Sequence, residues 1–139
     1  MKTIPTIGTV MTPSPVSIGI DETVRVAEEM MIDNGIRHLP VTESGILVGL
    51  LSDRDIAFTS NSTEPDLTDR LRVRDVCSLR VYAVERDAPL ELVLREMANR
   101  RIGSVVVTQK GSVVGLFTAT DACRCFAELL ESQFPSAGS

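Results

Sequence analysis

Two aspartates are the best candidates for binding chemistry, because each lies in the same short sequence context. Asp55 ends the run GLLSDRD (residues 49–55), and Asp121 ends the run GLFTATD (residues 115–121), 66 residues further on. Each follows by three residues a side chain that can cap a helix, Ser52 or Thr118, so both carboxylates are expected in a first helical turn. Such a carboxylate can accept two hydrogen bonds from the paired hydroxyls of a ribose. Alternatively, it simply complements the helix dipole.

The cations near these aspartates differ between the two copies. The first copy has Arg37, His38 and Arg54, and the second has uncharged residues at the matching positions 103, 104 and 120. Because bound phosphate needs positive groups, we expect two unequal sites, with phosphate capture favoured in the first. Three alternatives remain: Arg37 is an exposed strand charge, His38 is a partly buried hydrogen-bonded ring, or Arg54 pairs with a neighbouring aspartate at the surface.

The constant offset of 66 residues extends upstream through apolar positions and loops. Met31 matches Met97, Ile36 matches Ile102, and Gly45 matches Gly111. A register that is kept through loops indicates one supersecondary unit used twice.

The repeated unit is predicted to be strand, helix, strand, strand, helix. In the first copy the strands are 16–18, 36–41 and 46–51, with a turn at 42–45. Asp21 is the expected cap of the first helix, which ends at Asn34-Gly35, and Ser52 opens the second. In the second copy the strands are 81–84, 105–107 and 113–117. Asp87 is the expected cap of the first helix, and Thr118 opens a last helix that ends near Leu130.

This plan gives an α+β fold with two small mixed sheets, in which the two units are related by an approximate two-fold axis. One unit is too small to bury its sheet alone, so the pair is the expected folding unit. The predicted boundaries are 7–59 for the first unit, 60–72 for the linker, 73–130 for the second unit and 131–139 for a disordered tail.

Composition narrows the classes of function. A net charge of −5 over 139 residues argues against a nucleic-acid surface. No apolar run reaches membrane-spanning length, so no membrane insertion is expected. Three cysteines, an odd number without disulfide spacing, predict a cytoplasmic protein. Cys123 and Cys125 are interpreted as buried structural residues, because two positions apart on a helix point to different sides. With one histidine and no phosphate loop or nucleophile motif, no enzyme and no metal site are expected.

The two copies resemble tandem CBS motifs, which together form a Bateman module. The resemblance covers residues 7–130 and depends on Val10-Met11-Thr12, on GIRHLPV (residues 35–41) and on the two Gly-apolar-apolar-Ser/Thr-x-x-Asp runs. It implies a stand-alone regulatory module that binds AMP, ADP, ATP or S-adenosylmethionine in clefts between the motifs. It also implies a homodimer, an unidentified effector protein and no catalysis. No cofactor is required, although Mg²⁺ could accompany ATP. The alternative is a structural dimerisation module without a nucleotide ligand.

The resemblance also assigns site residues. Asp55 and Asp121 match the ribose-binding acid of the family, and Arg37 and His38 match its phosphate-contacting pair. Strand residues around them are candidate walls for an adenine ring, although apolar strand residues are more often core, and Tyr82 could stack on the base. The full candidate set is Val16, Ile18, Arg37, His38, Pro40, Ser52, Arg54, Asp55, Tyr82, Val84, Ser104, Val105, Thr118 and Asp121. The second copy departs from the pattern, with Cys77-Ser78-Leu79 in place of Met11-Thr12-Pro13.

Overall fold

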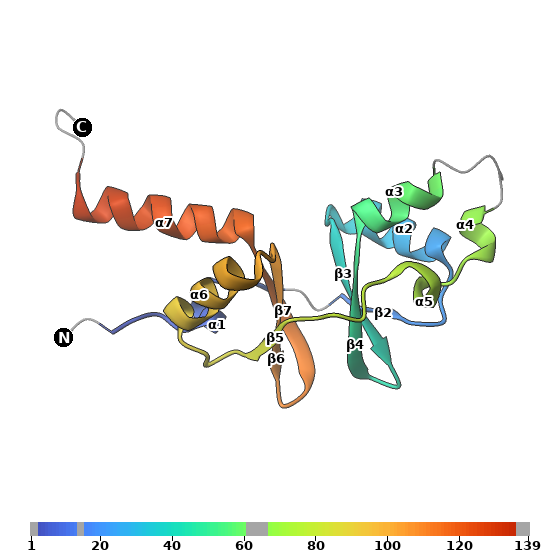
Figure 1. Ribbon diagram of the computed structural model, residues 1–139, viewed down its shortest axis with the longest axis horizontal. Coiled ribbons are helices and arrows are strands. Elements are labelled where there is room, and N and C mark those ends of the chain that lie inside the picture. Colours follow the sequence, from blue (N-terminus) through green and yellow to red (C-terminus); the bar gives the residue numbers. More distant parts are fainter. Residues whose placement is uncertain (1–2, 14–15, 61–66, 136–139) are drawn as a thin grey trace. The chain divides into compact units, whose positions relative to one another are not determined.

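The computed structural model describes residues 3–13, 16–60 and 67–135. Helices and short strands are interspersed along the chain (Figure 1). The elements are α1 (Ile7–Val10), β1 (Thr12–Pro13), β2 (Ile18–Gly19), α2 (Val24–Asn34), β3 (His38–Glu43), β4 (Ile46–Ser52), α3 (Asp53–Ser60), α4 (Leu67–Arg70), α5 (Val73–Val76), β5 (Ala83–Glu85), α6 (Leu90–Arg100), β6 (Ser104–Gln109), β7 (Ser112–Thr118) and α7 (Ala119–Gln133). The predicted α+β class is confirmed.

Both sheets are small and mixed, as predicted. In the first, β2 is parallel to β3, and β3 is antiparallel to β4. The β3–β4 turn places Ser44 and Gly45 at positive φ (52° and 80°), which is the hairpin geometry expected for residues 42–45. In the second sheet the strand order is β1-β7-β6-β5, with β5 parallel to β6.

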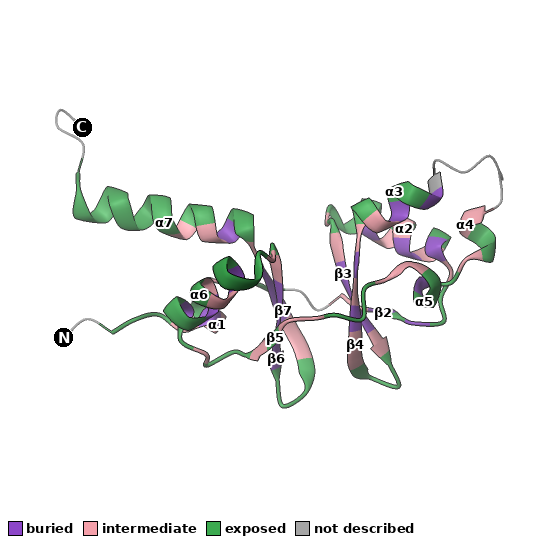
Figure 2. Cartoon of the chain, viewed as in Figure 1, coloured by how far each residue is buried: buried purple, intermediate pink, exposed green. Residues whose placement is uncertain are grey.

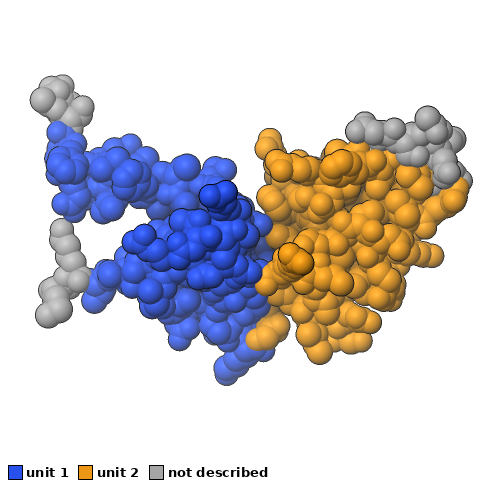
Figure 3. Space-filling view, viewed as in Figure 1, with its two compact units in different colours: residues 1–14, 82–110, 114–139 blue, residues 15–81, 111–113 orange. Residues whose placement is uncertain are grey.

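The chain forms two compact units (Figure 3). One contains residues 1–14, 82–110 and 114–139, and the other contains residues 15–81 and 111–113. Neither unit coincides with one sequence repeat, because the opening segment of each repeat packs in the unit formed by the other.

Backbone hydrogen bonds show this exchange for the first repeat. The N–H of Ile7, at the start of α1, donates to the carbonyl of Ala88 over 2.8 Å, and the N–H of Gly8 donates to that of Arg86 over 2.8 Å. Helix α1 therefore lies against the second repeat. The Ile7 side chain is fully buried there.

The second repeat makes the reciprocal contacts 66 residues later. The N–H of Val73, at the start of α5, donates to the carbonyl of Glu22 over 2.8 Å, and the N–H of Arg74 donates to that of Ile20 over 2.9 Å. The same two bonds thus hold α5 against the first repeat. The two repeats therefore exchange their short opening helices: α1 packs with the second repeat and α5 packs with the first.

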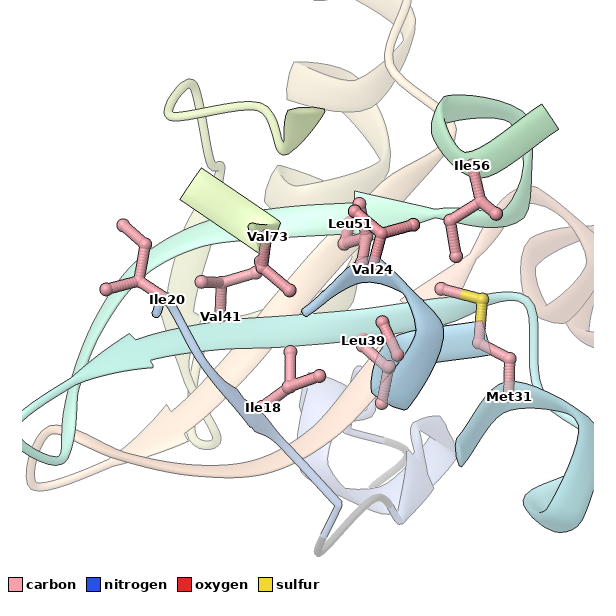
Figure 4. Close-up of a cluster of buried hydrophobic side chains, with 10 residues drawn as sticks. Ile18, Ile20, Val24, Met31, Leu39, Val41, Leu51, Ile56 and Val73 are labelled. Atoms are coloured by element: carbon pink, nitrogen blue, oxygen red, sulfur yellow. The ribbon is translucent and has the colours of Figure 1, made fainter. Parts of the chain in front are cut away.

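Each unit has its own hydrophobic core at matching repeat positions. Figure 4 shows the core that contains Val24, Leu39 and Leu51. The complete buried set is Ile18, Ile20, Val24, Ala27, Met31, Leu39, Val41, Leu51, Ile56 and Val73. The other core comprises Ile7, Leu90, Val93, Met97, Val105, Val107 and Phe117. The helical and strand periodicities of the sequence therefore mark the buried faces correctly.

The helix caps differ from the prediction in two places. Helix α2 is capped by Thr23, whose hydroxyl accepts from the N–H of Val26, and not by Asp21. The Asp21 carboxylate instead accepts from the Arg74 guanidinium at 2.9 and 3.2 Å. Helix α6 begins after Pro89 rather than at Asp87. The exchanged helix α5 supplies the cation for Asp21, which the position of Asp21 before a helix could not indicate.

Helix α7 continues to Gln133, three residues past its predicted end near Leu130. Figure 2 shows that it is exposed over most of its length. Helix α4 lies inside the predicted linker. The rest of that linker (61–66) and of the predicted tail (136–139) lies outside the described residues. In the described ranges, no helix has the length and apolarity to span a membrane.

Candidate functional site

Ser52 and Asp55 cap helix α3 reciprocally. The N–H of Asp55 donates to Oγ of Ser52 over 3.2 Å, and the N–H of Ser52 donates to Oδ2 of Asp55 over 2.9 Å. This arrangement is a capping box, so the expected capping role of Ser52 is confirmed. The carboxylate is thereby held in one orientation in the first turn of α3.

Thr118 and Asp121 form the same box at the start of α7. The N–H of Asp121 donates to Oγ1 of Thr118 over 3.3 Å, and the N–H of Thr118 donates to Oδ2 of Asp121 over 2.9 Å. The structure therefore places both candidate acids in equivalent local geometry. In each case the capping box needs only one carboxylate oxygen.

The second oxygen distinguishes the two acids. Oδ1 of Asp121 accepts from Nη2 of Arg124 over 2.7 Å and from the hydroxyl of Thr12 over 3.1 Å. Within the described ranges, Oδ1 of Asp55 has no donor. The Asp121 side chain is 6% exposed, whereas Asp55 is half-buried. Both oxygens of Asp121 thus accept hydrogen bonds from the protein, whereas among the described residues only Oδ2 of Asp55 does.

Glycine at the start of each repeated run allows another backbone segment to approach closely. A Cβ at Gly115 would lie 2.8 Å from the carbonyl oxygen of Thr12, and one at Gly49 would lie 2.7 Å from that of Ser78. Real Cβ atoms do not come so close, so only glycine fits at both positions. In one unit the close approach positions Thr12 beside Asp121.

The electrostatics of Asp121 follow from these contacts. Burial disfavours the charged form of its carboxyl, but hydrogen bonds from Thr118, Arg124 and Thr12 outweigh burial and lower its pKa. Asp121 is consequently ionised at neutral pH and is paired within its own unit.

His38 and Ser52 are direct neighbours across strands β3 and β4. Burial lowers the pKa of His38, and the negative charges of Asp53 and Asp55 oppose this only in part. The ring is therefore neutral at neutral pH. The structure brings His38, Ser52 and Asp55 together, and the second repeat brings Ser104, Thr118 and Asp121 to the matching places.

Arg37 and Arg54 are both exposed. The carbonyl of Arg37 accepts from the N–H of Asp53 over 2.9 Å, which fixes the backbone next to the α3 N-terminus. The Arg37 side chain borders an open groove of about 580 Å³ along α2 and α3. This groove is also lined by Glu28, Met31, Ile32, Gly35, Ile36, Asp53, Ile56 and Ala57. Arg37 thus borders this groove, whereas Arg54 projects from the first turn of α3.

The candidate adenine walls are mostly core residues. Ile18, Pro40 and Val105 are buried, and Val16 and Val84 are half-buried against the two cores. The Tyr82 ring carries the Arg100 guanidinium at 4.9 Å from its centre, a cation–π contact. The Arg100 contact therefore already occupies one face of the only tyrosine.

Two residues at this site, Thr12 and Arg124, were missed from the sequence. A signal existed for Arg124, because it lies three positions after Asp121 on one helix and such pairs are neighbours. Thr12 could not be found this way, because 109 residues separate it from Asp121.

The cysteines do not form a binding site in the described part of the chain. Cys123 is exposed, contrary to the expected burial, and Cys77 and Cys125 are half-buried. Burial raises the pKa of both half-buried thiols, which leaves them protonated at neutral pH. No cluster of three potential metal ligands occurs among the residues that the structure describes.

A family comparison accounts for the repeat. The sequence model of the CBS domain matches residues 7–60 and again residues 73–128. The chain belongs to the CBS-domain family. The two matched stretches carry the two capping boxes and every buried residue of both cores.

CBS-domain relatives of similar length are found in distant organisms. The chain is 26% identical over 111 residues to the CBS domain-containing protein YhcV of Bacillus subtilis, with 80% of this chain and 78% of YhcV aligned. It is 28% identical over 131 residues to a CBS domain-containing protein of Dictyostelium discoideum, covering 87% and 90% of the two chains. An inosine-5'-monophosphate dehydrogenase of Korarchaeum cryptofilum is 30% identical over 107 residues, but only 21% of that enzyme is aligned.

Solved CBS domain pairs share the fold. The CBS domain pair of protein MJ0100, in complex with 5'-methylthioadenosine and S-adenosyl-L-methionine, aligns with a TM-score of 0.76 and 24% identity, covering 91% of this chain and 99% of that one. CBSX2 in complex with AMP aligns with a TM-score of 0.73 and 22% identity, covering 90% and 98%. The fold of tandem CBS motifs is therefore shown.

Proposed function

We propose that this protein is a regulatory module that binds an adenosine-containing ligand. The observation that carries the proposal is the Asp55 carboxylate, which is held by Ser52 and keeps one oxygen without a donor in the described part of the chain. That oxygen is available to a ribose hydroxyl, and charge-assisted hydrogen bonds of this kind are strong. Adenosine ligands in two proteins of the same fold support the choice of ligand class.

Each candidate residue near Asp55 has a role in this proposal. The N-terminal amides of α3 and the guanidinium groups of Arg37 and Arg54 would bind phosphate or another anionic group. His38 would donate a hydrogen bond or, at lower pH, a charge. The half-buried residue Val16 would contact the base. Mg²⁺ would enter only with ATP.

The proposed module is cytoplasmic, performs no catalysis and signals to an effector protein. Signalling requires that the ligand bind two states of the module with different affinity. The absence of catalysis is supported by the alignment with the Korarchaeum cryptofilum dehydrogenase, because only 21% of that enzyme aligns with this chain.

We propose further that the protein is a homodimer. Helix α7 presents exposed apolar side chains at Phe126, Leu129 and Leu130, and Phe134 follows its end. A second copy would bury these groups, because monomers rarely leave contiguous apolar patches in water. Sedimentation at several protein concentrations would test this.

Thermal unfolding with AMP, ADP, ATP, NAD and S-adenosylmethionine tests the central proposal. A ligand at about a hundred times its dissociation constant adds about 2.7 kcal/mol of stability, which is several degrees in Tm. Asp55→Ala should abolish the shift, and Asp53→Ala is the matched control because it removes an exposed acid from the same turn. No shift with any ligand would favour the alternative, a structural dimerisation module.

A further inference from the structure

We infer that Thr12 and Arg124 occupy the carboxylate of Asp121, so that each chain binds one adenosine-class ligand, at Asp55. The inference rests on the proposed function. It makes Thr12 and Arg124 the residues that decide how many ligands a chain takes. The second repeat keeps the acid of the motif but uses it within its own unit.

The hydrogen bonds carry the first step. Asp121 accepts from the N–H and hydroxyl of Thr118 at Oδ2, and from Thr12 and Arg124 at Oδ1. Among the described residues, Asp55 accepts from the Ser52 N–H alone. A ribose at Asp121 would have to displace donors that are already in place.

The competition disfavours the ribose. A guanidinium donates a charge-assisted hydrogen bond, which is about twice as strong as one from a neutral hydroxyl. The Asp121 side chain is 6% exposed, so a ligand that displaced Arg124 would also have to reach a buried carboxylate. Removing Arg124 from a buried acid without an equivalent donor is costly.

The repeat locates the difference in two positions. Phe58 matches Arg124 and Ser78 matches Thr12 in the constant 66-residue register. Phe58 cannot donate and is 77% exposed. The Ser78 hydroxyl is used in its own turn, where it accepts from the N–H of Arg80 over 3.2 Å. The enclosing side chains are therefore present in one compact unit and missing from the other.

Isothermal titration of the full chain with AMP and S-adenosylmethionine tests the inference by stoichiometry. Wild type should bind one equivalent per chain, Asp55→Ala should lose it, and Asp121→Asn should retain it. The Thr12→Val, Arg124→Ala double variant should bind two equivalents. The inference would be overturned if the wild type bound two equivalents. It would also be overturned if the wild type bound one equivalent and Asp121→Asn abolished that binding.

A reciprocal variant keeps the test valid if the double variant does not fold. Phe58→Arg with Ser78→Thr should install the same donors at Asp55 and weaken binding about tenfold or more. Ile46→Arg adds the same charge at the other end of β4, on an exposed side chain, and should leave affinity unchanged. Unchanged affinity in the Phe58→Arg, Ser78→Thr variant would count against the inference.

The outcomes also separate the inference from the proposed function. Two equivalents in wild type would retain the function and reject the inference. No binding by wild type, with one equivalent bound by the double variant, would reject Asp55 as the ligand residue and retain the enclosure of Asp121. No binding by any variant would overturn both.

Discussion

The guanidinium of Arg124 donates to Oδ1 of Asp121 over 2.7 Å, within one turn of helix α7. The two side chains differ sharply in exposure, at 50% for Arg124 and 6% for Asp121. A half-exposed cation thus neutralises an almost buried acid, and the same acid receives the Thr12 hydroxyl from β1. Asp121, the last residue of the run at 115–121, therefore holds the N-terminal segment in place through Thr12.

Arg124→Ala should raise the pKa of Asp121 and lower the free energy of unfolding, because the almost buried carboxylate loses a charge-assisted donor, although solvent partly screens the half-exposed guanidinium. The pKa of Asp121 is depressed in the folded protein. Its stabilising contribution is therefore present above the pKa of an unfolded aspartate, about 3.9, and is lost as the pH falls through the folded value. Urea unfolding between pH 2 and 7 measures this.

Arg100→Ala is the matched control for that experiment. Arg100 lies 3.8 Å from Glu96 one turn away, but both of these side chains are about half exposed. Such surface pairs contribute at most about 0.5 kcal/mol, and the cation–π contact with Tyr82 adds a similar amount. Equal pH profiles for the two variants would contradict a special role for the Asp121 pair.

His38 should make the protein less stable in mild acid. Burial lowers its folded pKa below the ordinary value of about 6.5, so the unfolded chain takes up the proton first. Stability should therefore fall as the pH drops from about 6.5 through the folded pKa, and His38→Gln should remove this slope. Because the chain has one histidine, its NMR titration is unambiguous. A measured pKa above 6.5 would reject the burial argument.

Gly49→Ala and Gly115→Ala should each destabilise the protein by about 1–3 kcal/mol, because at both positions the added Cβ meets a backbone carbonyl oxygen, which cannot move aside as the end of a side chain can. These oxygens belong to Ser78 and Thr12, at 2.7 and 2.8 Å, and at Gly115 the Cβ also meets Sδ of Met11 at 2.5 Å. Gly103→Ala is the control, since a Cβ there has no neighbour within 4 Å. Thermal denaturation of the three variants decides the matter, and similar Tm values throughout would contradict the close approach.

Local signals in the sequence predicted most of the fold. The 3.6-residue spacing of Val24, Ala27 and Met31 marks a buried helix face, and these three side chains are in the core. The run from glycine to aspartate predicted both strand ends and the caps at Ser52 and Thr118. These features depend on residues within one turn or one strand of each other.

Features that depend on distant residues were not predicted. Asp21 has the residue type and position of a helix cap, yet its carboxylate binds Arg74, 53 residues away. Thr12 reaches Asp121 only because α1 and β1 pack with the second repeat. The same exchange explains both errors: a repeat in sequence indicates two similar units, but not which copy of the short opening helix each unit contains.

The exchange itself gives the last prediction. Ile7 lies in the core that also contains Leu90 and Val93 of the second repeat, and its exposed fraction is 0%. Ile7→Ala should cost about 2–5 kcal/mol because it leaves a cavity there, whereas Ile4→Ala, at a site that is 60% exposed, should change stability by about 0.5 kcal/mol or less. Amide hydrogen exchange shows where the protein is destabilised. Ile7→Ala should reduce amide protection more in β6 than in β3, although in sequence Ile7 is 97 residues from Ser104 in β6 and only 31 from His38 in β3. A greater loss of amide protection in β3 would mean that α1 packs with its own repeat in solution. The exchange of opening helices between the repeats would then be wrong.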